Sequence, residues 1–449
     1  MADTLIRGAT VITMDRQGDL PHADILVRGD CIADIAPSLQ VDDAEVVDAA
    51  GCIVIPGLVN AHMHTWQTAL RGVAANWTLL EYFQKMHAGL ATAFQPEDLF
   101  IATRVGALNQ LNCGTTTLAD WCHNNPTPQH NDAAIEGLLT TGIRAAFFHG
   151  TPKPDPKPGQ VPFWEVPHPR REVERLLKAH QGHALLAIHA AVLGPHYSTL
   201  DVALHDFRMA RELGLIASLH QGGGAARTPD GWERLEAEGL LGSHVNIVHG
   251  HALSDAQLKR FCDLGMSFSA AAESEMSQGH GHPLTGRLRQ FGRAPSLGVD
   301  LESVLSGDML TQARVALGIQ RSLDNVAHRE QHGTIPSTST IRTREALSWV
   351  TVEGARMLQQ LDRIGTLAAG KQADLVVIRA SDLNMQPVHD AVSSVVFQTS
   401  LANIDSVMVA GRWKKRGGRL LAGDLTGDLA RLRASGEKIT RAMGLQQRR

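Results

Sequence analysis

The sequence has few cysteines, no excess of basic residues and no long apolar run. Its five cysteines are scattered and form no CxxC pair, so neither a disulfide framework nor a zinc knuckle is expected. Reduced thiols of this kind are typical of a cytoplasmic protein. Lys and Arg number 42 against 46 Asp and Glu, and the resulting net charge of -4 argues against nucleic acid as a partner.

Membrane association is not expected either. No uninterrupted apolar segment reaches membrane-spanning length, and the first residues, MADTLIRGATVITMD, lack the charged-then-apolar layout of a secretory signal. Hydrophobic residues make up 43% and charged residues 20% of the 449 residues, as in an ordinary globular protein. We therefore expect a cytoplasmic protein whose partner is a small molecule. The unusual feature is the content of 22 histidines.

Short apolar runs alternate with helix-compatible segments through the middle of the chain. Near-continuous apolarity over a few residues is typical of strands buried on both faces of a parallel sheet. Eight such runs occur, at 53–59, 115–120, 144–150, 185–192, 215–221, 245–250, 266–271 and 296–300. Segments between them, such as VALHDFRMARELG, have helical apolar spacing and end in glycine. The pattern predicts an α/β protein with a (β/α)8 TIM barrel.

The two ends of the chain carry short alternating strands with turn signals instead. They predict one small β-sandwich domain built from both ends. The predicted divisions are a composite β-sandwich domain over 1–55 and 364–423, a metal-dependent barrel over 56–363, and a solvated C-terminal helix and tail over 424–449 with Leu425, Leu429 and Leu432 on one face. A Pro-rich segment, 150–169, follows the third predicted barrel strand and is expected to overhang the barrel mouth.

Histidines and one aspartate mark the ends of several predicted strands. His62 and His64 are two residues apart, so both side chains face the same side of a strand. This pair alone would be weak evidence for a metal, because histidines at strand ends usually make ordinary hydrogen bonds. His220, His249 and Asp300, however, end the fifth, sixth and eighth runs, at the barrel face where such enzymes keep their chemistry. Three histidines and an aspartate would form a divalent metal site suited to zinc or iron, with an open position for water.

A metal in this place implies hydrolytic chemistry. A divalent ion would lower the pKa of its bound water to about 7 and so provide hydroxide at neutral pH. Asp300 could bind the metal and accept the proton of the water. His249 is either a further ligand or a group that hydrogen bonds to the hydroxide or to a developing oxyanion, and we favour the second role.

At these motifs the chain resembles the amidohydrolase superfamily. Within it, the resemblance is to the cytosine-deaminase-like group that includes triazine hydrolases, guanine deaminases and adenosyl-type deaminases. The matching motifs are PGLVNAHMH with the following QTALRG, ASLH at 217–220, VHGHALSD at 248–255, LGVD at 297–300 and IGTLAAGKQADLVVI at 364–378. They extend over essentially the whole chain.

The resemblance implies a ligand set. His62, His64, His220 and Asp300 would bind one divalent metal ion, zinc being favoured over Fe2+ or Mn2+, and His249 would touch the hydroxide or the substrate. The segment LLAIHAAV holds no lysine, whereas binuclear relatives carry a carboxylated lysine there, so a mononuclear site is expected. Relatives often dimerise, and a homodimer is a further expectation.

One position departs from the family pattern. Deaminases of this group carry a proton-shuttling glutamate three residues after the fifth-strand histidine, and here that position is Gly223 in HQGGG. Candidate replacements are Glu273, Glu275, His123 and Glu302. We rank Glu273 and Glu275 first, because their segment leaves the active face of the barrel directly. Alternatively, Asp300 and His249 perform both proton transfers.

Substrate contacts are expected mainly from the segment after the His62 and His64 pair. Gln67 is the preferred binding residue, and Trp66 could stack on a planar ring or simply pack in the loop. His123 and His282 are further candidates. The predicted function is hydrolysis of a C–N bond, by deamination or amide-type cleavage, in a small cyclic or heteroaromatic compound. Alternatives are loss of a halide or thiol from a similar ring, or a metal-binding scaffold without turnover.

Overall fold

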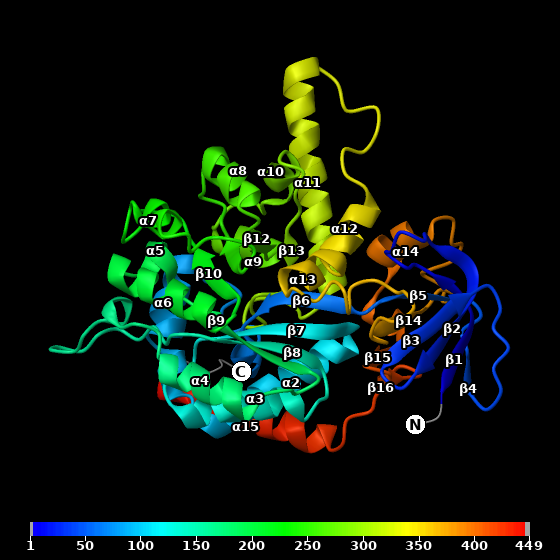
Figure 1. Ribbon diagram of the computed structural model, residues 1–449, viewed down its shortest axis with the longest axis horizontal. Helices are drawn as coiled ribbons and strands as arrows, with labels where there is room; N and C mark the ends of the chain where they lie inside the picture. The colour runs from blue at the N-terminus through cyan, green and yellow to red at the C-terminus, as the bar shows by residue number, and fades with distance from the viewer. Residues whose placement is uncertain (1–2, 445–449) are drawn as a thin grey trace.

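The computed structural model describes residues 3–444 and contains the expected barrel (Figure 1). Its eight parallel strands, in neighbour order, are β6 (Leu58–Met63), β7 (Thr115–Cys122), β8 (Arg144–His149), β9 (Leu186–Ala191), β10 (Ala217–Gln221), β11 (Val245–His249), β12 (Ser267–Ala270) and β13 (Ser296–Leu297). A parallel bridge between Met63 and Asp300 brings the last strand beside the first. The strands are mostly buried, as expected of a sheet covered on both faces. The TIM-barrel prediction is confirmed.

Helices follow the strands of the barrel. They are α1 (Leu79–Tyr82), α2 (Pro96–Asn112), α3 (Pro128–Leu139), α4 (Arg170–Ala179), α5 (Gly194–Tyr197), α6 (Leu200–Glu212), α7 (Gly231–Ala237), α8 (Asp255–Asp263), α9 (Ala272–Gln278), α10 (Thr285–Arg289), α11 (Met309–His332), α12 (Thr343–Trp349) and α13 (Val352–Met357). The long helix α11 projects beyond the rest of the molecule (Figure 1). Among residues 3–444, no helix combines the length and apolarity needed to cross a bilayer.

Strands from both chain ends interleave in one nine-stranded sheet, so the predicted composite β domain is present. Its strands are β1 (Thr4–Val11), β2 (Leu20–Arg28), β3 (Cys31–Ala36), β4 (Glu45–Asp48), β5 (Cys52–Pro56), β14 (Leu375–Arg379), β15 (Ile404–Val409), β16 (Arg412–Arg416) and β17 (Arg419–Leu420), and helix α14 (Ala391–Gln398) lies between β14 and β15. A buried ion pair ties this domain to the barrel: Arg144 Nε of β8 lies 2.8 Å from Asp374 Oδ2, just before β14.

The apolarity of the run 53–59 predicted one barrel strand. The structure has two strands there, which belong to different sheets. β5 pairs with β1 and β14 in the β domain, and β6 starts the barrel at Leu58. Gly57 separates them, and a Cβ at this position would lie 2.0 Å from Thr116 Oγ1. The chain can therefore pass from one sheet to the other only with glycine at this close contact.

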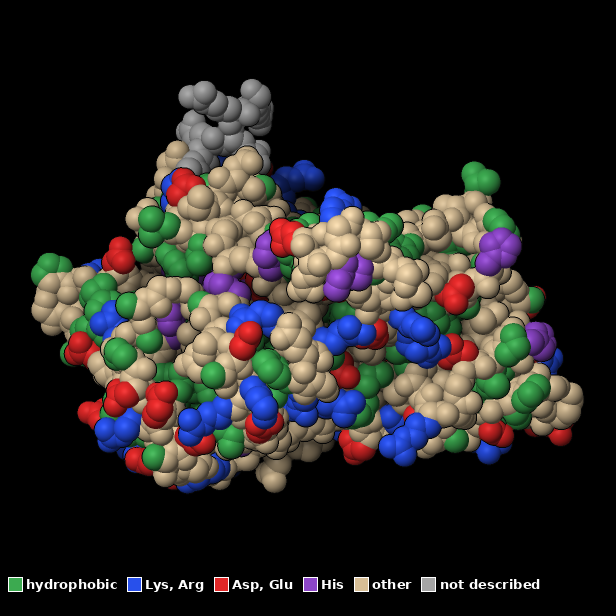
Figure 2. Space-filling view, turned by 90° about the horizontal axis from the view of Figure 1, so that it is seen from above, with side chains coloured by type: hydrophobic (Ala, Val, Ile, Leu, Met, Phe, Trp, Pro, Cys, Tyr) green, Lys and Arg blue, Asp and Glu red, His purple; other side chains and the backbone are tan. Residues whose placement is uncertain are grey.

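The sequence predicted a solvated C-terminal helix. Helix α15 (Leu425–Ala442) is instead partly buried. It packs on α2, where Leu432 joins Ile101 and Val105 in a small apolar cluster. The predicted apolar face is also wrong in part, because Leu429 is 43% exposed. Over the surface in Figure 2, basic and acidic side chains are interspersed, consistent with a chain that has no strongly basic face there.

Candidate metal centre and active site

The predicted ligands meet at the C-terminal end of the barrel. The Nε2 atoms of His62 in β6 and His220 in β10 lie 3.2 Å apart. Asp300 Oδ1, beyond β13, lies 3.4 Å from Nε2 of His62 and 3.4 Å from Nε2 of His64. The ligand atoms of His62, His220, Asp300 and His249, at the end of β11, all lie within 4.8 Å of one another. This group includes His249 in place of the predicted His64, whose Nε2 reaches it through Asp300. Polar side chains at or just beyond the ends of four strands thus lie close together.

These separations fit a single metal ion. Zinc binds imidazole nitrogen at about 2.0–2.1 Å, so the edge of a tetrahedron of ligands is about 3.3 Å. The observed separations of 3.2 and 3.4 Å match that edge. Imidazole nitrogens with one carboxylate oxygen are also the donor set that zinc and iron accept. The residues present therefore fit a divalent ion.

Hydrogen bonds from the far side of the rings orient two of the histidines. His64 Nδ1 donates to the carbonyl oxygen of Trp121 at 2.6 Å, which leaves the lone pair of Nε2 directed at the cluster. His249 Nδ1 lies 3.0 Å from Glu275 Oε1, and Glu275 is fully buried. Such partners are typical of histidines that bind metal or act beside one, because they fix the tautomer and the ring plane.

The protonation states also suit a cation. Burial lowers the pKa of His62, lowers that of His64 to about 3 and holds that of His220 well below its usual value, so these rings are neutral at pH 7. Burial opposes ionisation of Asp300, but its hydrogen bond with His62 and the neighbouring imidazoles lower its pKa overall. Neutral imidazoles and an ionised carboxylate are the forms that bind metal without first losing a proton.

Two residues of this cluster have left-handed backbone conformations. The φ angles are 66° at His249 and 67° at Asp300, at the ends of β11 and just beyond β13. Residues other than glycine rarely adopt this region, and the cost is tolerated where surrounding structure fixes it, often at functional sites. At both positions the turn directs the side chain to the barrel axis.

The comparisons with known proteins agree with this geometry. A model of the amidohydrolase family matches residues 53–414. The chain belongs to the amidohydrolase family. It is 30% identical to an 8-oxoguanine deaminase from Pseudomonas aeruginosa, over 88% of this chain and 89% of that one.

More distant relatives extend the same picture. The amidohydrolase is 23% identical to a 5-methylthioadenosine/S-adenosylhomocysteine deaminase from Caldicellulosiruptor saccharolyticus, over 94% of this chain and 95% of that one. Its fold is similar to that of atrazine chlorohydrolase from Arthrobacter aurescens complexed with zinc, with a TM-score of 0.81, 23% identity, and coverage of 96% of this chain and 100% of that one. The resemblance predicted from the motifs is confirmed.

A cavity opens on the cluster of this amidohydrolase. It is lined by His64, Leu79, Tyr82, Phe83, His87, His123, Lys153, Tyr197, His220, His249, Gln278, His280, Asp300 and Leu301. Aromatic rings and hydrogen-bonding groups dominate this wall, as expected of a site for a planar polar molecule.

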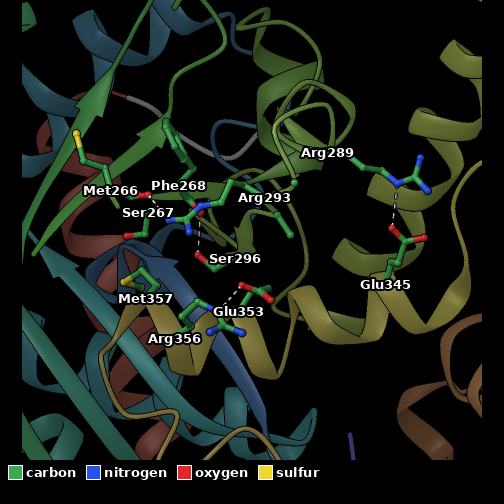
Figure 3. Close-up of a pocket in the computed structure, with 12 residues that line it drawn as sticks. Met266, Ser267, Phe268, Arg289, Arg293, Ser296, Glu345, Glu353, Arg356 and Met357 are labelled. Atoms are coloured by element: carbon green, nitrogen blue, oxygen red, sulfur yellow. Dashed lines mark hydrogen bonds and ion pairs between the residues drawn. The ribbon is translucent and has the colours of Figure 1, made fainter. Parts of the chain in front are cut away.

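A larger cavity lies at the amino ends of β12 and β13 (Figure 3). Two of its arginines are paired with glutamates: Arg356 Nε lies 3.0 Å from Glu353 Oε2, and Arg289 Nε lies 3.1 Å from Glu345 Oε2. The third, Arg293, donates from Nη2 to the carbonyl oxygen of Met266 at 3.2 Å. In TIM barrels this face serves stability, while catalysis occurs at the opposite face. We therefore assign it no role in the chemistry.

The structure places two predicted substrate contacts behind the cavity wall. Trp66 has no exposed surface and packs in the core, with Phe94 and His123 as ring neighbours. Gln67 is also fully buried, and its Nε2 donates to Tyr82 Oη at 2.5 Å. The predictions of direct contact are wrong, because the segment after His64 turns into the 3-10 helix Thr65–Leu70 and inserts these side chains into the core. Gln67 instead contacts Tyr82, which lines the cavity.

The candidate acids differ in whether the structure brings them to the active site. Glu275, on α9, bonds to His249 and lies behind it, whereas Glu273 points away and bonds to Gln312. Glu273 is therefore not brought to the cavity, contrary to its ranking. Glu302 is paired with Arg71, Nη2 to Oε2 at 2.6 Å, which makes both structural.

The candidate histidines also differ in whether they line the cavity. His123 lines the cavity, with its ring centroid 4.3 Å from that of His64. His282 is exposed and lines a different surface depression, so the structure does not bring it to the site. The neighbouring His280 does line the cavity, with its ring centroid 4.5 Å from that of His249.

Sequence reasoning missed several residues of the wall, among them Tyr82, His87, Lys153 and Tyr197. Tyr82 and His87 lie after the first strand, beyond any metal motif, and no pattern marks them. A signal for Lys153 did exist, because the Pro-rich segment 150–169 was expected to overhang the barrel mouth. Ser274 was missed too, although its neighbours on both sides were candidates: its Oγ donates to Asp300 Oδ2 at 2.7 Å.

Proposed function

We propose that this amidohydrolase is a mononuclear zinc enzyme that deaminates a small planar heterocycle. The observation that carries the proposal is the cluster of His62, His64, His220 and Asp300, whose spacing fits one ion, at the floor of a cavity. The 30% identity to an 8-oxoguanine deaminase supports cleavage of an exocyclic C–N bond.

Asp300 is placed to move the first proton. A bound divalent ion would supply the nucleophile by lowering the pKa of a water to about 7. Asp300 Oδ1 faces His62 and His64, while Oδ2 accepts a hydrogen bond from Ser274 Oγ. This orientation lets the carboxylate accept a proton from the attacking water as its oxygen bonds to the ring carbon.

His249 stabilises the charge that develops at the ring. Burial lowers its pKa, but the hydrogen bond to Glu275 and the charge of Asp300 outweigh burial and raise the pKa overall. The protonated ring can then donate a hydrogen bond from Nε2. The proton taken by Asp300 passes to the leaving nitrogen, the C–N bond breaks and ammonia departs. The second proton of the water passes to the adjacent ring nitrogen, and the former water oxygen becomes the new carbonyl.

A second reaction has one specific observation in its favour. Gly223 stands where deaminases of this group carry their glutamate, so the cavity lacks the acid that usually protonates a leaving amine. Halide or thiol needs no such proton. Hydrolytic loss of halide or thiol from a similar ring is therefore the alternative reaction.

Metal analysis and product detection test the proposal together. Purified protein is expected to hold one zinc ion per chain and to release ammonia from members of a panel of aminopurines, aminopyrimidines, pterins and aminotriazines. Chloride and thiol release from substituted triazines is measured in parallel, and release of these groups without ammonia would favour the alternative. Absence of bound divalent ion, with no activity restored by adding one, would overturn both. Tight zinc binding without any turnover would indicate a silent scaffold.

We also propose a cytoplasmic homodimer. All five cysteines are free thiols, which supports a reducing compartment. Sedimentation of the purified chain measures its oligomeric state directly.

A further inference from the structure

Lys153 stands at the cavity without a partner. It belongs to the Pro-rich segment after β8, and it lines the same cavity as His64, His220 and Asp300. Its Nζ lies 5.6 Å from the centroid of the Trp121 ring and 5.3 Å from that of Tyr197. The ammonium is thus held against two aromatic faces at the wall of the site.

No acidic side chain of the described residues 3–444 neutralises Lys153. It forms no ion pair there, whereas Lys85 and Lys438 lie 2.7 and 2.5 Å from carboxylates. Burial alone lowers the pKa of Lys153 to about 8, so it still carries its charge at neutral pH. Lys153 is half-buried, and holding an ammonium partly away from water without a partner is costly, so a bound anion would reduce that cost.

Two of the glycines that follow His220 lie near this part of the site. A Cβ at Gly222 would lie 2.4 Å from Tyr197 Oη, so only glycine lets Tyr197 take its place beside Lys153. At Gly223, the position of the family's glutamate, a Cβ would face His251 Nε2 at 3.4 Å. Gly223 therefore supplies no acid, and the carboxylate and the ammonium that line the cavity are those of Asp300 and Lys153.

A buried hydrogen-bond donor also lines the cavity without a partner. Gln278 Nε2 has no partner among the described residues. The one carboxylate lining the cavity, Asp300, is engaged with His62, His64 and Ser274. An acceptor atom on a ligand would satisfy Gln278 Nε2.

We propose that Lys153 binds an anionic group of the substrate, a carboxylate or an ionised ring oxygen, held between the faces of Trp121 and Tyr197. This inference rests on the proposed function, because it takes the cavity as the substrate site. It narrows the substrate class to planar heterocycles that carry a negative charge on the side facing β7 and β8. A neutral nucleobase would leave the ammonium unpaired.

Equilibrium binding tests the inference without requiring turnover. Titration calorimetry on the zinc-loaded full chain compares two matched pairs: pterin-6-carboxylate with pterin for the carboxylate, and urate with hypoxanthine for the ionised ring. We expect the anion of at least one pair to bind about ten-fold tighter than its neutral partner. The preference should disappear in Lys153→Gln and persist in Lys153→Arg. Lys157→Gln, on the exposed part of the same loop, is the matched control and should bind like the wild type.

Zinc content and circular dichroism establish that each variant is folded and loaded. Equal anion preference in Lys153→Gln and wild type would overturn the inference, because the anion would then sit on the metal or elsewhere. Binding of neither anion by the wild type, or a preference for both neutral ligands, would overturn it as well. A preference that depends on Lys153 in a protein that releases no ammonia would support the anion site and contradict deamination.

Discussion

At the scale of single residues, two glutamates two positions apart have different environments. Glu275 bonds to His249, and Glu273 bonds to Gln312 outside the cavity. We predict that Glu275→Gln lowers kcat by about 10–100-fold with zinc content unchanged, because partners behind an active-site histidine have effects of that size. Glu273→Gln is the matched control and should retain wild-type kcat. Equal losses in the two variants would contradict the assignment.

The hydrogen bond between Glu275 and His249 is also expected to influence how activity depends on pH. The hydrogen bond from Glu275 raises the pKa of His249, so the protonated ring persists to higher pH than it would without this partner. If protonated His249 is the active form, activity is present below its pKa and is lost as pH rises through it. Replacing Glu275 by Gln should therefore move the basic limb of the kcat profile to lower pH. A profile that keeps the same basic limb in both proteins would assign that limb to another group.

The candidate metal-binding cluster was predictable, and most of the cavity wall around it was not, for a physical reason. His62, His64, His220, His249 and Asp300 stand at strand ends, and a parallel barrel brings all such ends to one face. Cavity-lining residues such as Lys153 and Tyr82 are placed by loops and short helices, whose geometry depends on packing. Trp66 and Gln67 lay next to the right motif, yet one 3-10 turn directed both into the core.

At the scale of elements, apolar runs located the barrel strands because strands buried on both faces have a continuous apolar pattern. The same property hid the boundary between β5 and β6, since both are buried although they belong to different sheets. Only the contact of Gly57 with Thr116 separates them. The buried face of α15 could not be predicted from the apolar pattern either, because Asp428 and Ser435 are buried on it while Leu429 is exposed.

Helix α15 offers a direct test of that packing. Leu432 is 8% exposed in the cluster with Ile101 and Val105, and Leu429, one turn earlier, is 43% exposed. We predict that Leu432→Ala lowers the free energy of unfolding by about 2 kcal/mol, as for a leucine at the margin of a core. Leu429→Ala should change it by less than about 0.5 kcal/mol. Denaturant unfolding of the two variants measures the difference, and similar costs would mean that α15 is solvated on both faces.

At the scale of the whole molecule, the ligand cluster joins strands that are far apart in sequence. β6 and β13 close the barrel, and Asp300 reaches across this closure to His62 and His64. An ion held there by residues of β6, β10 and the segment after β13 binds the folded chain and not the unfolded one. Free zinc at 100 times its dissociation constant would then stabilise the fold by about 2.7 kcal/mol.

We therefore predict that zinc raises the Tm of metal-free protein and that a chelator reverses the rise. The shift should vanish in a His62→Asn, His220→Asn double variant, because two of the ligands that span the barrel are then missing. His282→Asn, in an exposed loop, serves as control and should keep the full shift. If zinc raised the Tm of the double variant as much as that of the wild type, the stabilising ion would have to bind elsewhere. The closure of the barrel would then not be stabilised by the metal.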